Sequence, residues 1–238
     1  LLTFEYSPAT LSIKKVRPVA TVAGGGQFSY DGLPHAATCT VVGVNGQTFQ
    51  GPISYSPGLN EPPVNVSTVT ATCDFAENEN YLSASDTDEI EIVKAVPAVA
   101  LTGGPFTYDG TTHSATCSIT GVGNQTLAHT LSYSPGPDGP RNVTTTDSAT
   151  CALAGDGNYE SASMTRTLVV NPRQITITAD PKTKSYGEVD PALTYKITDG
   201  SLVPGDPLTG TLIRDPGEAA GASYAIKQGT LTAGTNYF

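Results

Sequence analysis

A block of 78 residues occurs twice in this chain, and this repeat limits the possible folds more than any other feature of the sequence. Residues 18–95 and residues 96–173 agree, without gaps, at 32 of 78 positions. Landmarks that return at the same offset are Phe28, Tyr30, Asp31, Gly32, His35, Cys39, Tyr55, Pro57, Cys73, Asn80 and Tyr81. Two blocks with this much agreement are copies of one structural module, so the chain is best understood as an array.

Composition indicates which kind of module is repeated. The 238 residues include 25 Gly and 18 Pro, no Trp and one Met. Short stretches of alternating apolar and polar residues are separated by Gly and Pro, which is typical of short strands joined by turns. A module of this size can bury only a modest core. The sequence therefore predicts an all-β chain.

Four cysteines form two pairs, Cys39 with Cys73 and Cys117 with Cys151, each separated by 34 residues. Strand alternation places every one of them on the apolar face of its segment. We predict that each pair forms a disulfide across the core, worth about 3–4 kcal/mol in the loop-entropy model. Such disulfides indicate an oxidising, extracellular environment. The alternative is a pair of buried free thiols; a metal site is disfavoured because there is no Cys-x-x-Cys pair or neighbouring His.

The charge balance excludes one class of partner. The formal net charge is −10, with only 12 Lys and Arg, whereas nucleic-acid binding needs clustered positive charge. No apolar run approaches the roughly 20 residues of a membrane span. No signal peptide opens the sequence, which we interpret as a start inside a longer protein.

Two repeated histidines, His35 and His113, are the obvious candidates for catalysis. No Ser or Cys nucleophile is arranged around either of them, so we interpret both as structural hydrogen-bonding residues. The Tyr-Asp-Gly run before each histidine is typical of a turn, because glycine readily adopts a positive φ. Residues 77–80 and 156–158 could offer oxygens to calcium but lack the spacing of a recognised loop. We therefore predict no catalytic, cofactor-binding or metal-binding residue.

Several spaced motifs resemble one known family. Tyr-Asp-Gly-x-x-His-x-Ala-Thr, Ser-Tyr-Ser-Pro, the Thr-Ala-Thr before Cys73 and Asn-Tyr-x-Ser-Ala-Ser resemble the bacterial immunoglobulin-like repeats called MBG or YDG domains. The resemblance covers residues 18–173 and implies a tandem array of immunoglobulin-like β-sandwich modules, at 17–95 and 96–172, on a secreted or cell-surface protein. The cysteine pairs depart from the family pattern, which suggests added stability rather than a new activity.

Residues 173–238 are similar to a second subtype, the MBG domain of YGX type. The similarity lies in an alternating strand from Ile175, in Lys184-Ser185-Tyr186-Gly187, and in a closing Asn236-Tyr237. It again implies a surface-array repeat without known catalytic residues. Arg214 and Glu218 are expected to pair at a turn.

Residues 1–16 have no module of their own. Leu2, Phe4 and Tyr6 alternate, and so do Leu11 and Ile13 after a turn at Ser7-Pro8, which predicts two short strands. A YGX-type module would continue beyond Asn236-Tyr237 with such strands, and residues 173–238 with 1–16 make 82 residues. We expect residues 1–16 to complete the module of a neighbouring copy, either along one longer polypeptide or in a separate subunit, leaving 173–238 incomplete at its C-terminus. The alternative is an arbitrary boundary with both ends frayed.

Asn65, Asn124 and Asn142 match the N-glycosylation acceptor pattern. In a bacterium such sites are usually unmodified.

The sequence favours a structural and interaction protein over an enzyme. We expect an extracellular rod or fibre that contacts neighbouring copies head to tail, with no cofactor. The alternative is an adhesin region that binds a surface glycan or protein. A third hypothesis is that the chain is the accessory region of a secreted enzyme. The lack of Trp and the 6 Phe offer little support for glycan binding.

Overall fold

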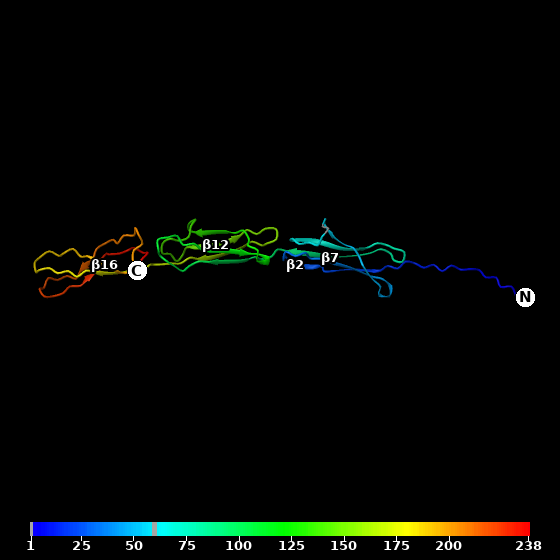
Figure 1. Ribbon diagram of the computed structural model, residues 1–238, viewed down its shortest axis with the longest axis horizontal. Coiled ribbons are helices and arrows are strands. Elements are labelled where there is room, and N and C mark those ends of the chain that lie inside the picture. The colour runs from blue at the N-terminus through cyan, green and yellow to red at the C-terminus, as the bar shows by residue number, and fades with distance from the viewer. Residues whose placement is uncertain (1, 59–60) are drawn as a thin grey trace. The chain divides into compact units, whose positions relative to one another are not determined.

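The computed structural model describes residues 2–58 and 61–238, and it is built from strands β1 to β18 with two short 3-10 turns (Figure 1). This confirms the all-β prediction. Contacts divide the chain into two compact units. Unit 1 comprises Leu1–Ala98, Thr120–Leu127 and Ala154–Ala162, and unit 2 comprises Val99–Ile119, Ala128–Leu153 and Ser163–Phe238. Two loops of the second repeat therefore pack with the first repeat.

The first repeat is a sandwich of two sheets. Its strands are β1 (Val19–Ala23), β2 (Gly26–Ser29), β3 (Thr38–Val42), β4 (Thr48–Gln50), β5 (Ile53–Ser56), β6 (Ser67–Phe75) and β7 (Ala84–Val93). One sheet has the order β1-β3-β4 and the other has the order β2-β7-β6-β5. All neighbours are antiparallel except β2 and β7, which run parallel.

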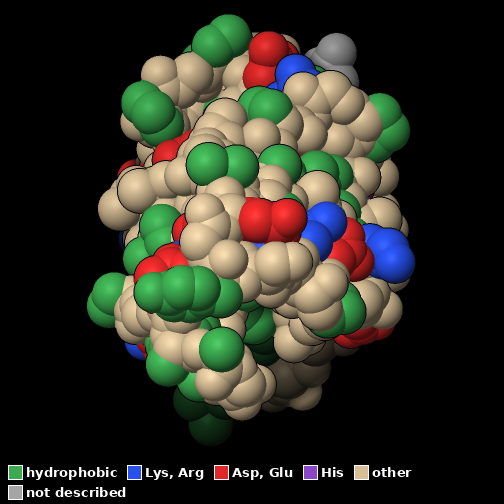
Figure 2. All heavy atoms as spheres, turned by 90° about the vertical axis from the view of Figure 1, so that its left-hand side faces the viewer, with side chains coloured by type: hydrophobic (Ala, Val, Ile, Leu, Met, Phe, Trp, Pro, Cys, Tyr) green, Lys and Arg blue, Asp and Glu red, His purple; other side chains and the backbone are tan. Residues whose placement is uncertain are grey.

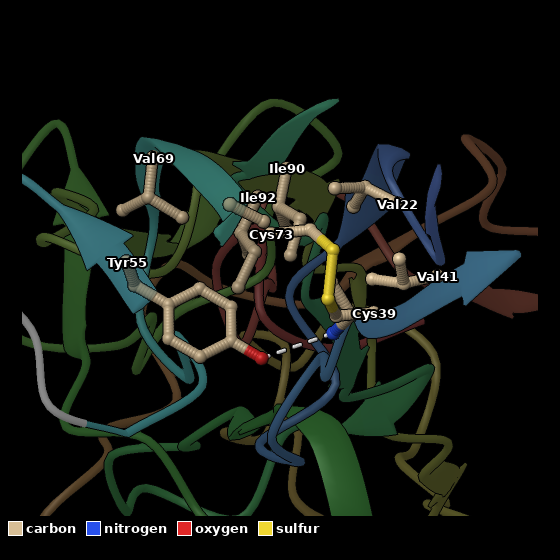
Figure 3. Close-up of a cluster of buried hydrophobic side chains, with 10 residues drawn as sticks. Val22, Cys39, Val41, Tyr55, Val69, Cys73, Ile90 and Ile92 are labelled. Carbon is tan, nitrogen blue, oxygen red and sulfur yellow. Dashed lines mark hydrogen bonds between the residues drawn. A yellow bond between two sulfur atoms is a disulfide. The ribbon is translucent and has the colours of Figure 1, made fainter. Parts of the chain in front are cut away.

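The core of this sandwich is shown in Figure 3. Val41, Ile90 and Ile92 are at most 1% exposed, because alternation on β3 and β7 directs them inward. The Cys39–Cys73 disulfide joins β3 of one sheet to β6 of the other. The backbone N–H of Ala37 donates to the hydroxyl of buried Tyr55 at 3.0 Å, the dashed line in Figure 3. Tyr55, near the end of β5, therefore anchors this strand in the core.

The second repeat contains the same parts. Its strands are β8 (Ala98–Thr102), β9 (Phe106–Thr107), β10 (Thr116–Thr120), β11 (Thr130–Ser134), β12 (Ser148–Leu153), β13 (Ala162–Thr167) and β14 (Val170–Asn171). They form the sheets β10-β8, β11-β12-β13 and β14-β9. The Cys117–Cys151 disulfide crosses its core, so both cysteine pairings expected from the spacing are confirmed.

Residues 175–238 are less completely packed. Four strands occur here, β15 (Thr176–Ala179), β16 (Tyr195–Asp199), β17 (Ile213–Arg214) and β18 (Ile226–Lys227). They form two separate two-stranded sheets, β15-β16 and β17-β18. Within this segment, every residue of which the structure describes, only Leu231 and Tyr237 are buried hydrophobic residues.

The prediction of two strands in residues 1–16 is wrong for the single chain. Residues 2–15 contain no strand and extend away from the first repeat, in blue in Figure 1, and Leu1 lies outside the described residues. Leu2 and Phe4 are each 98% exposed. A strand exists only where another strand accepts its hydrogen bonds, and the rest of the described chain offers none to this segment.

Candidate functional site

The most elaborate polar arrangement in the chain is the joint at which one module meets the next. A parallel bridge links the residue at the start of each module, or directly before it, to a tyrosine in that module: Val16 to Tyr81, Ala95 to Tyr159, and Arg173 to Tyr237. At the joint around Ala95, called the first joint below, Ala95 N donates to Asn158 O and Glu160 N donates to Ala95 O, both at 3.0 Å; the joint around Arg173 is called the second joint. Two backbone hydrogen bonds thus fix each linker to the Asn-Tyr turn.

The Asn-Tyr turn is shaped by the residue two positions before its asparagine. Asp156 Oδ1 accepts from the backbone N–H groups of Asn158 and Tyr159, at 2.7 and 2.8 Å. Asn78 accepts in the same way from Asn80 and Tyr81. From the sequence alone, these side-chain oxygens were possible calcium ligands. In the structure they accept backbone hydrogen bonds that stabilise the turn. Among the described residues no cluster of His, Cys, Asp or Glu is arranged to hold a metal ion.

Each of these tyrosines is anchored by its hydroxyl. Tyr159 Oη accepts from Val122 N at 3.0 Å and donates to Gln125 at 3.2 Å. A Cβ at Gly121 would collide with this hydroxyl, so only glycine fits there. Sequence reasoning missed these partners, although Gly43, Val44 and Gln47 recur at the 78-residue offset and make the same contacts to Tyr81. Their recurrence was the signal that could have identified them.

Across the joint, the asparagine side chain reaches the preceding module. Asn158 Oδ1 accepts from Val66 N and its Nδ2 donates to Asn65 Oδ1, both at 3.0 Å. The ring of Tyr30 packs edge-on against Tyr159, with centroids 5.5 Å apart. All of these residues lie in unit 1.

The next joint, inside unit 2, repeats this pattern. Asn236 Oδ1 accepts from Val143 N at 3.0 Å, and Asn236 Nδ2 donates to Asn142 Oδ1 at 3.2 Å. Tyr108 and Tyr237 make the edge-on ring contact at 5.5 Å. Two of the three glycosylation motifs therefore provide joint residues, Asn65 and Asn142. Asn124 lies instead in a 3-10 turn (Val122–Asn124), and glycosylation of all three remains a prediction.

One carboxylate distinguishes the second joint from the first. Asp206 Oδ2 accepts from the hydroxyl of Tyr237 at 2.6 Å and from that of Tyr108 at 2.8 Å. These two hydrogen bonds lower the pKa of Asp206, and Arg141 adds a smaller electrostatic attraction. The pKa of Tyr108 is raised mainly by its hydrogen bond to Asp206, and that of Tyr237 mainly by burial.

The second joint is therefore expected to loosen in acid while the first does not. Because the folded pKa of Asp206 lies below its ordinary value, its contribution is present above pH ~4 and is lost as pH falls through the folded pKa. At the first joint the equivalent acceptor is the amide of Gln125, which does not titrate. Hydrogen exchange between pH 6 and pH 3, corrected for intrinsic rates, should show faster opening at Phe238 and not at Glu160. Equal loosening at both joints, or an unchanged pH profile in Asp206→Asn, would contradict this.

The two repeated histidines have structural surroundings. His35 Nε2 lies 3.2 Å from Asp31 Oδ1, and its ring stacks on Phe28 with centroids 4.2 Å apart. His113 stacks on Phe106 in the same way, and its Nε2 is 3.4 Å from Asp109, within ion-pair range but without hydrogen-bond geometry. The turn predicted at Tyr-Asp-Gly is confirmed by the positive φ of Gly32, 77°.

The pair expected between Arg214 and Glu218 is part of a larger network. Arg214 Nη2 lies 2.5 Å from Glu218, and Arg214 Nε lies 2.8 Å from Asp190. Lys184 contacts both carboxylates, at 2.7 Å from Asp190 and 2.8 Å from Glu218. The hydrogen bonds from Arg214 and then Lys184 lower the pKa of Asp190 to about 2. All four charges face one another, so the network ties together the loops that contribute them.

Comparison with known proteins gives a family match for one segment of the chain. Residues 175–238 match the family model of the MBG domain, YGX type. The MBG domain is a non-catalytic repeat domain of bacterial surface proteins. The resemblance of residues 18–173 to YDG-type repeats stays a prediction. No curated protein and no solved structure matches the chain. No helix in the described residues is long and apolar enough to cross a membrane.

Proposed function

We propose that this chain is a structural and interaction segment of an extracellular bacterial surface protein, in which immunoglobulin-like modules in series form a rod or fibre. The observation that carries the proposal is the joint that occurs twice with the same contacts: a backbone bridge, an Asn-Asn pair, an asparagine-to-backbone hydrogen bond and an edge-on tyrosine pair. Such a joint is useful to a protein whose function depends on a fixed orientation of neighbouring modules.

Linker length supports the same proposal. Only a few residues, around Lys94–Pro97 and Asn171–Arg173, separate the modules, and prolines restrict them further. Backbone hydrogen bonds at Ala95 and Arg173 leave these linkers little freedom. A chain selected for independent domains would carry longer Gly/Ser linkers. The two disulfides and the surface-protein family of residues 175–238 support an extracellular setting.

The proposal is tested by the spread of distances across each joint. Pairs of labels on neighbouring modules are expected to give a narrow distance distribution in the wild-type chain. Asn158→Ala should broaden the distribution across the first joint and leave the second unchanged, and Asn236→Ala should do the reverse. Each variant is thus the control for the other. Wild-type distributions as broad as those of the variants would argue against a spacer function.

The second candidate function is a ligand-binding adhesin region. It is favoured by an open hollow in residues 175–238 that is lined by Tyr186, Tyr224 and the Arg214 network. Four charged side chains of this hollow are already paired with one another, which leaves fewer donors for a ligand: Lys184, Asp190, Arg214 and Glu218. Binding to a glycan array that is lost in Tyr186→Ala would favour this function over the first.

A further inference from the structure

In the first and second repeats, the same two positions shortly before the bridging residue of the joint carry buried apolar side chains. Five and three residues before Ala95 are Ile90 and Ile92, which are 0% and 1% exposed. The corresponding residues before Arg173 are Leu168 and Val170, both 0% exposed. Ile90 and Ile92 belong to the core of the first repeat, and Val170 belongs to a buried cluster with Tyr108 and Tyr237 at the second joint.

The third instance of this position is entirely exposed. Five and three residues before Val16 are Leu11 and Ile13, each 89% exposed. Leu2, Phe4 and Tyr6 form a separate alternating stretch and are 98%, 98% and 87% exposed. Five exposed apolar side chains lie on one extended segment, and a concentration of exposed apolar side chains marks an interaction site.

An apolar face that lacks such a cover lies in residues 175–238. An open hollow of about 350 Å³ is lined there by Ile175, Ile177, Leu212, Ile226 and Leu231. Ile175, Ile177, Leu212 and Ile226 are only partly buried, so this face is not a finished core. Figure 2 looks at the end of the molecule where this segment is drawn and shows hydrophobic side chains on the surface among acidic and basic ones.

The first repeat shows which strand covers such an apolar face in a complete module. There β7 lies between β2 and β6 and brings Ile90 and Ile92 into the core. In residues 175–238, all of them described, the strands form only two separate pairs, β15-β16 and β17-β18. Isolated two-stranded sheets are marginal in water, and further strands on the apolar face would stabilise them.

We propose that residues 2–14 of one chain form the closing strands of residues 175–238 in a second copy of this chain. This inference rests on the proposed function as a module array and names its partner. Leu11 and Ile13 take the positions that Ile90 and Ile92 take in the first repeat, and Leu2, Phe4 and Tyr6 add a second stretch. Addition of strands to an open sheet satisfies backbone groups on both sides. The contact joins unlike surfaces, so it propagates head to tail.

An independent observation indicates that the same end of the chain is built to meet a preceding module. Asn80 occupies the position of Asn158 and Asn236, whose side chains bond to the module before them. Asn80 is exposed, and no described residue gives its side chain a hydrogen bond. The partner that the repeat pattern assigns to Asn80 is therefore a module on the far side of Val16.

The experiment compares three chains. The 238-residue chain is expected to form linear oligomers whose mass, measured by sedimentation velocity, rises with concentration. A chain lacking residues 1–16 should stay monomeric. A chain in which residues 1–16 are moved behind Phe238 through a short flexible linker should also stay monomeric, with slower hydrogen exchange at residues 223–233. A 238-residue chain that remains monomeric at every concentration would overturn the proposal.

A peptide of residues 2–14 supplies a direct binding test. It should bind the chain lacking residues 1–16 and slow hydrogen exchange at residues 223–233. Leu11→Asp with Ile13→Asp in the peptide should weaken binding at least tenfold, whereas Thr10→Asp with Ser12→Asp, on the opposite strand face, is the matched control. Equal binding by both peptides, or no binding by the unchanged peptide, would refute the strand assignment. Distances across the first joint, measured in the same truncated chain, test the spacer function separately.

Discussion

Replacing Cys39 and Cys73 together by alanine is expected to lower the free energy of unfolding of the first repeat by about 4 kcal/mol. The closed loop spans 34 residues, and the loop-entropy model assigns a value of this size to such a loop. Small domains are stable by only about 5–15 kcal/mol, so the loss is a large fraction of the total. Cys39 and Cys73 are also 3% and 0% exposed, and the smaller alanines leave space in the core.

Urea unfolding without reductant measures this effect. The matched control is Cys117→Ala with Cys151→Ala, which should move the unfolding transition of the second repeat and leave that of the first in place. Reductant should shift both transitions in the wild-type chain. A loss below about 1 kcal/mol would show that the packing of the sandwich, and not the covalent bond, determines its stability.

Tyr159→Ala is expected to cost about 3–5 kcal/mol, the range for removing a buried aromatic side chain. Tyr159 is 3% exposed, and its hydroxyl bonds to Val122 and Gln125, so truncation leaves a cavity and breaks both hydrogen bonds. The edge-on contact with Tyr30 is lost as well, so the first joint should loosen together with the second repeat.

Two further substitutions make this prediction graded. Tyr159→Phe keeps the ring and removes only the hydroxyl, so it should cost about 0.5–1.5 kcal/mol. Tyr186→Ala removes a tyrosine that is 77% exposed and should change stability by no more than about 0.5 kcal/mol. Calorimetry of the three variants gives the order directly. A cost for Tyr159→Ala similar to that for Tyr186→Ala would mean that the joint does not depend on its tyrosine.

Much of the interior could be predicted because alternation in a strand is a local property. Cys39 and Cys73 were expected on the apolar faces of their strands, and both are buried. The same reasoning was wrong for the single chain at residues 2–15, which alternate equally well but have no partner strand. A period of two tells which side chains share a face. It carries no information about whether another strand is present to pair with the segment.

By itself, the sequence determined the all-β class, the two disulfide pairings and the turn at Gly32, because each follows from composition and spacing within one repeat. Only the tertiary structure decided what the repeated polar residues do. Asn158 and Asn65 are 93 residues apart in sequence, yet their side chains form a hydrogen bond across a joint. Tyr108 and Asp206 are separated by 98 residues and meet at the next joint. Such contacts arise from the packing of one module on another, which the composition and periodicity of either module alone do not encode.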